Sequence, residues 1–214
     1  MSIVLAFDIE RSDTFDCHNT IGIGACVVDE NLKELDSLLL EGFIPTFVDF
    51  EPRCWEQFWS KNQNKLMKLK YRGALSFKER QKEMIVTFQN FRRKWEDKAR
   101  EMKNNFYFVS DNPVYDGSFI NQMIFEHTKD MPIPYNMSGS YESFFDVHSM
   151  QKGFLMAKDS SFNSDWSFNK YIEEHYDLPK KERQHDHNPV NDAYSIAYDF
   201  LVLQHIQQGK IKNK

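Results

Sequence analysis

Residues 1–10 read MSIVLAFDIE, an apolar run that ends in two acidic residues, Asp8 and Glu10. The run predicts a buried central strand over 3–9, and residues two apart in a strand point to the same face of its sheet. Both carboxylates therefore leave the strand in one direction. Two like charges on one face repel each other, and burial removes their hydration. A hard divalent cation such as Mg²⁺ or Mn²⁺ would resolve this conflict, because such ions prefer oxygen ligands.

The composition indicates one folded domain. The chain has 214 residues, of which 41% are hydrophobic and 15% aromatic, enough material for one sizeable core. We therefore expect residues 1–214 to form a single domain, with a frayed basic tail over about 209–214. No apolar stretch reaches the roughly 18 residues that are needed to span a membrane.

Charge and cysteine usage exclude several classes of function. The formal net charge of −5 argues against a protein that coats duplex nucleic acid through bulk charge. The three cysteines form no CxxC pair, which argues against a structural zinc site and favours reduced thiols in an intracellular compartment, the cytoplasm or the nucleus. Basic residues still gather in three groups, any one of which could follow a phosphate backbone: Lys61, Lys65, Lys68, Lys70 and Arg72; Arg92, Arg93 and Lys94; Lys180, Lys181 and Arg183.

The rest of the chain predicts a mixed sheet with helices packed on it. β-rich runs at 20–28 and 35–43 favour an antiparallel meander with the first strand. Helical spacing is clearest over 76–102, where Ser76 and Glu79 form a capping box. Further expected elements are strands over 106–110 and 143–147, helices over 51–62, 148–158, 165–175 and from 189 on, an apolar helix face at 119–124 and an exposed charged loop over 179–188. This order indicates an α/β fold, a mixed five-stranded sheet flanked by helices.

Further acidic residues stand where a metal site on this sheet would need them. Asp116 follows the strand over 106–110 by one turn, and sites of open α/β sheets gather at the carboxyl ends of strands. His187 lies on the charged loop, and Asp192 lies in the first turn of the last helix. Each residue alone has an ordinary explanation, such as a helix-start acid, an exposed histidine or a surface ion pair. Their joint order is what indicates a site.

Three short motifs carry a resemblance to a known family. The segments FDIE (7–10), DNPVYD (111–116) and HNPVNDA (187–193) resemble the three motifs of the DEDDh class of 3′–5′ exonucleases. The segment TIGIGACVVD (20–29) also resembles the second strand of that family. The class includes polymerase proofreading subunits and stand-alone RNA-trimming enzymes. The resemblance implies a ribonuclease H-like form of the predicted α/β fold.

The resemblance also implies a role for each residue by its position. Asp8, Glu10, Asp116 and Asp192 would be catalytic residues that hold two divalent cations, Mg²⁺ or Mn²⁺, and His187 would be the general base. Two such ions can hold the attacking and the leaving oxygen of a phosphodiester. A histidine with an unperturbed pKa of about 6.5 can take a proton at neutral pH. Such an enzyme shortens single-stranded RNA or DNA from the 3′ end and releases nucleoside 5′-monophosphates.

The same resemblance also implies candidate substrate contacts. Asn112 resembles a family position near the substrate strand. After Glu10, the small turn with threonine and glycine that is usual in the family is replaced by RSDTFDCHN (11–19). Ser12 and Phe15 in this segment are the remaining candidates for gripping the terminal nucleotide.

Several alternatives stay open. His185 competes with His187 for the role of base but lies seven residues before Asp192, which fits the family spacing less well. Asp111 competes with Asp116, although its place at the strand end favours a role in the turn. A non-catalytic nucleic-acid-binding module or an endonuclease on the same fold are the other functions to consider. RNA and DNA are equally open, because discrimination depends on contacts to the 2′-hydroxyl.

Overall fold

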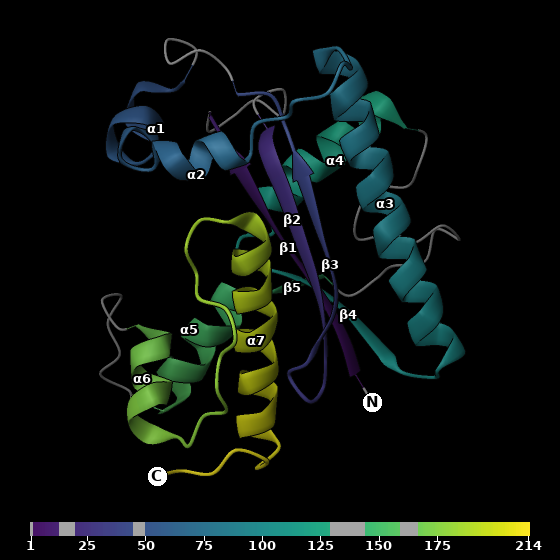
Figure 1. Cartoon of the computed structure of the whole chain (residues 1–214). Helices are drawn as coiled ribbons and strands as arrows, with labels where there is room; N and C mark the ends of the chain where they lie inside the picture. Colours follow the sequence, from purple (N-terminus) through teal and green to yellow (C-terminus); the bar gives the residue numbers. More distant parts are fainter. Residues whose placement is uncertain (1, 13–19, 45–49, 129–143, 159–166) are drawn as a thin grey trace.

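The structure, a computed structural model, describes residues 2–12, 20–44, 50–128, 144–158 and 167–214 (Figure 1). The predicted site residue Phe15 lies outside these ranges. Within them, five strands form one mixed sheet in the order β3-β2-β1-β4-β5, and helices pack on it. The predicted α/β architecture is therefore confirmed. No helix in the described ranges is long and apolar enough to cross a membrane.

The first predicted strand is the centre of the sheet. β1 (Ser2–Arg11) pairs antiparallel with β2 (Thr20–Asp29), which pairs antiparallel with β3 (Glu34–Glu41), so the predicted meander is confirmed. On its other side β1 pairs in parallel with β4 (Asn105–Ser110), and β4 pairs in parallel with β5 (Phe144–Asp146). The carboxyl ends of β1, β4 and β5 therefore lie at one edge of the sheet.

One face of the sheet is covered by α7 (Pro189–Gln207), with α5 (Val147–Lys158) and α6 (Phe168–His175) beside it (Figure 1). Val4 and Ala6 of β1 are buried in the core on this face. Since side chains alternate along a strand, Asp8 and Glu10 continue the same row towards the start of α7.

The opposite face is covered by α3 (Phe77–Glu101) and α4 (Asp116–His127). The odd-numbered residues of β1 between positions 3 and 9 are buried against these two helices. α3 begins at the predicted capping box, where the Ser76 backbone N–H donates to the Glu79 carboxylate at 2.9 Å. Its aromatic residues belong to the core, as the helical spacing predicted.

The helix predicted over 51–62 is divided in the structure. The chain here forms two short helices and a 3₁₀ turn: α1 (Pro52–Gln57), η3 (Trp59–Lys61) and α2 (Gln63–Lys68). The break lies at Phe58, whose backbone leaves the helical region (φ −127°, ψ −70°). It allows Trp59 to be buried, and the indole Nε1 donates a hydrogen bond to the Arg11 carbonyl oxygen at 2.7 Å. Burial of this indole beneath the end of β1 thus overrides the helical pattern.

The C-terminal tail also differs from the prediction. The backbone of the tail pairs with the chain after α6, through a bridge between Tyr176 and Asn213 and a 3.1 Å hydrogen bond from the Asp177 N–H to the Lys212 carbonyl oxygen. The Lys214 N–H donates to the His175 carbonyl oxygen at 2.9 Å. The tail is therefore held by its backbone rather than frayed, a contact that its basic composition does not signal.

Candidate active site

Five carboxylates meet at the carboxyl end of β1. Oxygen atoms of Asp8, Asp111 and Asp116 lie within 4.8 Å of one another, and so do those of Asp8, Glu10 and Asp192. Asp8 belongs to both groups. Glu10, Asp116 and Asp192 are buried, whereas Asp8 and Asp111 are half-buried. The structure thus brings together the four predicted carboxylates and adds Asp111, for which the sequence favoured a role in a turn.

β1 and β4 pair in parallel, so the acids that follow β4 lie at the same edge of the sheet as Asp8 and Glu10. β4 ends at Ser110, and α4 begins one turn later with Asp116. The Asp116 carboxylate accepts a hydrogen bond from the Ser110 Oγ at 3.0 Å, and the Asp116 N–H donates to the Asn112 carbonyl oxygen at 2.8 Å. The turn between strand and helix therefore fixes the orientation of Asp116 towards β1.

A glycine of β2 lets α7 reach the same edge. Gly24 lies opposite Asp8 in the ladder between β1 and β2. A Cβ atom at Gly24 would lie only 2.0 Å from the backbone carbonyl carbon of Pro189, the first residue of α7. The backbone of α7 therefore packs directly on β2, which brings Asp192 beside Asp8. At Gly22, in contrast, an added Cβ would meet its nearest atom at 3.5 Å, an ordinary contact.

Burial and mutual repulsion raise the pKa values of these acids. Burial, followed by the charge of Glu10, raises the pKa of Asp8 well above its usual range. Burial and the charges of Asp192 and Asp116 raise the pKa of Glu10 to about 8. Burial and the charge of Asp111 raise the pKa of Asp116 to about 7. The cluster therefore carries more negative charge than its protein surroundings neutralise.

Arg11 supplies part of the missing positive charge from the other side of β1. Its guanidinium is buried and stacks on two rings of α4 and the turn before it, with Cζ 3.3 Å from the centroid of Tyr115 and 3.9 Å from that of Phe119. The Nε and Nη1 atoms have no hydrogen-bond partner in the described part of the chain. Its charge lowers the pKa values of Glu10 and Asp116, so it offsets some of the repulsion.

His187 stands on the loop before α7, which has neither helix nor strand over 179–188, as predicted. The backbone of His187 is left-handed (φ 62°), a strained conformation for a residue other than glycine. The N–H groups of Asp186 and His187 donate to Asp192 Oδ1 at 2.9 Å and 3.2 Å, which folds the loop over the first turn of α7. The imidazole and the Phe58 ring make a T-shaped contact, with centroids 4.5 Å apart.

His185 lies closer to the acids than its spacing in the sequence suggested. Its Nε2 is 3.6 Å from Asp192 Oδ2, and its ring centroid is 5.1 Å from that of His187. Burial, followed by the charges of His185 and Lys65, lowers the pKa of His187. His187 is therefore neutral at neutral pH and able to accept a proton.

Lys65 of α2 is the member of the three basic groups that reaches the site. Its Nζ donates a 2.6 Å hydrogen bond to the Asp186 carbonyl oxygen, and its charge lowers the pKa of Glu10. In the third group, Lys181 pairs with Asp199 at 3.0 Å and Arg183 pairs with Glu34 at 2.8 Å. In the second group, Arg92 is buried in α3. The first basic group thus reaches the candidate site through Lys65.

The three predicted substrate contacts have different positions. Ser12 is fully buried at the end of β1, and its carbonyl oxygen accepts a hydrogen bond from the Glu51 N–H at 3.0 Å. Asn112 is exposed at the edge that carries the acids. Phe15 lies outside the described residues, and the substrate role of all three stays a prediction.

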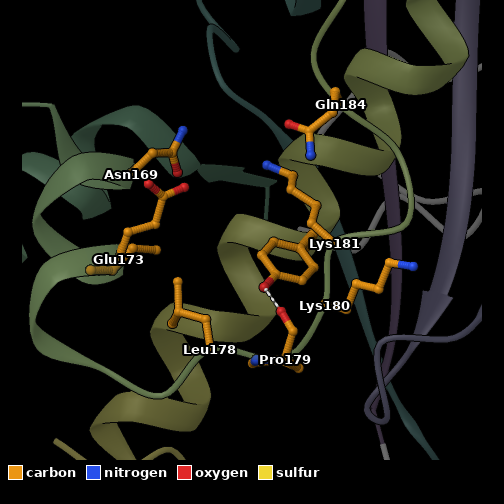
Figure 2. A pocket seen from close by; sticks show the side chains of 9 residues that line it. Asn169, Glu173, Leu178, Pro179, Lys180, Lys181 and Gln184 are labelled. Atoms are coloured by element: carbon orange, nitrogen blue, oxygen red, sulfur yellow. Dashed lines mark hydrogen bonds between the residues drawn. The ribbon is translucent and has the colours of Figure 1, made fainter. Parts of the chain in front are cut away.

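A pocket of about 520 Å³ lies between α6 and the first half of the 179–188 loop (Figure 2). Two contacts hold this part of the loop on α7: the Tyr198 hydroxyl donates to the Pro179 carbonyl oxygen at 2.5 Å, and Lys181 pairs with Asp199. None of the five clustered carboxylates lines the pocket, so it is separate from the candidate site. Its lining residues are Asn169, Ile172, Glu173, Leu178, Pro179, Lys180, Lys181, Gln184 and Tyr198.

Comparison with known proteins identifies the fold. No family model and no curated protein matches this sequence. Among solved structures, the chain is similar to one described as "3′-end specific recognition of histone mRNA stem-loop by 3′-exonuclease", with 12% sequence identity and a TM-score of 0.51. The match covers 97% of this chain and 83% of that chain. At this identity the likeness shows the fold alone, and the mixed five-stranded sheet with its helices is ribonuclease H-like, as predicted.

Proposed function

We propose that the protein is a metal-dependent 3′–5′ exonuclease that acts on single-stranded 3′ ends of RNA or DNA. The observation that carries this proposal is the convergence of Asp8, Glu10, Asp116 and Asp192 at one edge of the sheet, with His187 beside them. The fold likeness to a 3′-exonuclease supports the same reaction class. The three sequence motifs supply the assignment of each residue.

The donor atoms fit two divalent cations, Mg²⁺ or Mn²⁺. The two carboxylate groups share Asp8 and contain only oxygen donors, which hard ions prefer. Burial, with charge repulsion added to it, raises the pKa values of Glu10 and Asp116, and a bound cation would offset both effects. Bound there, the ions would activate the attacking water and stabilise the departing 3′ oxygen.

His187 and Asp192 have roles in this proposal that complement those of the metal ions. His187 accepts a proton from the attacking water at a ring nitrogen, for which its lowered pKa keeps it neutral. Asp192 holds the loop that carries His187 through two backbone N–H groups. Hydrolysis breaks the bond between phosphorus and the 3′ oxygen, so the products are a nucleoside 5′-monophosphate and a strand that is one nucleotide shorter.

The test uses 5′-labelled RNA and DNA oligonucleotides of one sequence, incubated with Mg²⁺ or Mn²⁺. We expect a ladder of products that shorten by single nucleotides, with release of 5′-mononucleotides, and a preference that shows which sugar is used. The His187→Ala variant should lose the activity. Internal fragments would indicate an endonuclease instead. Binding without shortening of either polymer, or equal rates for His187→Ala and wild type, would overturn the proposal.

A further inference from the structure

A third group of possible metal ligands differs from the two carboxylate groups in its chemistry. It consists of His185, His187 and Asp192, whose ligand atoms lie within 4.8 Å of one another. We propose that these three side chains form a site for a divalent transition ion such as Zn²⁺, and that an ion bound there stops hydrolysis. The site is distinct from the proposed Mg²⁺ or Mn²⁺ centre, with which it shares only Asp192.

The donor set selects the class of ion. Two imidazole nitrogens and one carboxylate oxygen are a common zinc set, whereas Mg²⁺ takes oxygen ligands. Zn–N and Zn–O bonds of about 2.0–2.1 Å place tetrahedral ligands about 3.3–3.5 Å apart, and a water can take the fourth position. His185 Nε2 and Asp192 Oδ2 are already 3.6 Å apart. The other ligand distances are within 4.8 Å, and the side chain of His185 is about half exposed (49%), so burial does not fix it in one position.

The other two ligands are held in place, since Asp192 lies in the first turn of α7 and the loop that carries His187 is bonded to it. Asp192 Oδ1 accepts the two N–H groups of the loop, which leaves Oδ2 turned towards His185. The Lys65 Nζ donates to the Asp186 carbonyl oxygen, and the Asn191 Nδ2 donates to Asp186 Oδ1 at 2.9 Å. The ion would therefore find most of its site already formed.

Occupation of this group would remove two parts of the hydrolytic site. Asp192 also belongs to the carboxylate group with Asp8 and Glu10, and His187 is the proposed base. An ion that takes the Asp192 Oδ2 and the lone pair of His187 prevents both from acting in hydrolysis. The inhibitory effect rests on the proposed function, whereas binding of the ion does not.

The first experiment measures Zn²⁺ binding by calorimetry without nucleic acid, once without Mg²⁺ and once with excess Mg²⁺, because Mg²⁺ held by Asp8 and Glu10 would compete for the shared Asp192. It compares wild type with His185→Gln and with His175→Gln, a matched change of an exposed histidine at the end of α6. We expect wild type and His175→Gln to bind one Zn²⁺ equally tightly, and His185→Gln to bind it at least about tenfold more weakly. Equal binding by wild type and His185→Gln, or no binding by wild type, would overturn the site.

The second experiment measures hydrolysis of a labelled single strand with Mg²⁺ and increasing Zn²⁺. With each rate expressed relative to the same protein's rate without Zn²⁺, we expect His185→Gln to need at least about tenfold more Zn²⁺ than wild type for half inhibition. If Zn²⁺ inhibits both proteins equally, the inhibitory role is wrong. If wild type does not hydrolyse the strand at all, the proposed function fails while the calorimetry still decides the zinc site.

Discussion

The two halves of the candidate site are built in different ways. The carboxylate half (Asp8, Glu10, Asp111, Asp116 and Asp192) stands on or directly beside regular elements, and three of its members are buried. The imidazole half (His185 and His187) stands on a loop and is held by contacts from elsewhere, such as the 2.6 Å hydrogen bond from Lys65 on α2. Sheet register and helix packing therefore position the acids, whereas a few side-chain contacts position the histidines.

Asp192 joins the two halves. Its Oδ1 accepts the N–H groups of Asp186 and His187, its Oδ2 faces His185, and it belongs to the group with Asp8. A change at this residue should disturb both halves at once. Changes at other residues should affect one half more than the other.

The largest effect is expected for Asp192→Asn. It removes a carboxylate ligand and weakens the support of the loop, so the single-turnover rate constant for hydrolysis should fall by about 10³-fold or more. Asp177→Asn, at an exposed acidic residue on the chain after α6, is the control and should retain the rate. A rate for Asp192→Asn within about threefold of wild type would contradict its role.

Gly24→Ala should push the start of α7 away from β2. Its Cβ would lie 2.0 Å from the Pro189 carbonyl carbon, so the start of α7 must move. Overpacking of this kind costs about 1–3 kcal/mol, and each kcal/mol lowers the Tm of a domain of this size by about 2–4 °C. Gly22→Ala, where the nearest atom would be 3.5 Å away, should leave the Tm and the rate almost unchanged. Calorimetry and hydrolysis rates that do not distinguish the two variants would contradict the close approach.

Lys65→Met should act mainly on the imidazole half, and it also removes a positive charge that lowers the pKa of Glu10. It removes the hydrogen bond to the Asp186 carbonyl oxygen and keeps the aliphatic part of the side chain. We expect kcat to fall by about tenfold because the loop carrying His187 is less well placed, with a smaller change in Mn²⁺ affinity. Lys65→Arg should restore part of kcat, and Lys68→Met on the exposed side of α2 should have no effect. A weaker Mn²⁺ affinity with unchanged kcat would show that Lys65 serves the carboxylate half instead.

The carboxylate half should make stability fall as the pH rises. The folded pKa of Glu10 is raised from 4.5 to about 8, so between these values the folded state binds more protons than the unfolded state. Stability from this group is therefore fully present below about pH 4.5 and is lost as the pH rises through about 8. We expect the Tm of the metal-free protein to fall by a few degrees between pH 5 and pH 8, and Glu10→Gln to reduce that slope. A Tm that rises over this range in wild type would contradict the assignment.

The carboxylate half was largely predictable from sequence. Alternation along β1 places Asp8 and Glu10 on one face, and the structure shows Val4 and Ala6 of the same row in the core beneath α7. The place of Asp116 in the site could be predicted because this residue lies one turn after the end of β4. Asp111 joins the group because the chain turns beside β1 directly after Ser110, which local turn preferences do not reveal.

The imidazole half was less predictable, because spacing along a loop says little about distance. The left-handed backbone of His187 turns the loop, and His185 thereby reaches Asp192. Gly24 did carry a usable signal, since a glycine inside a strand often marks a close backbone approach. Lys65 could not be chosen among the basic residues, because its position depends on the break that the burial of Trp59 introduces after α1.

The most direct test of the central claim is a crystal structure with Mn²⁺ and a non-hydrolysable single strand, with the metal positions taken from anomalous scattering. We expect two ions about 3.5–4 Å apart. Both should be bound by Asp8, one together with Asp116 and the other together with Glu10 and Asp192. Ions bound elsewhere, or none at this edge of the sheet, would contradict it.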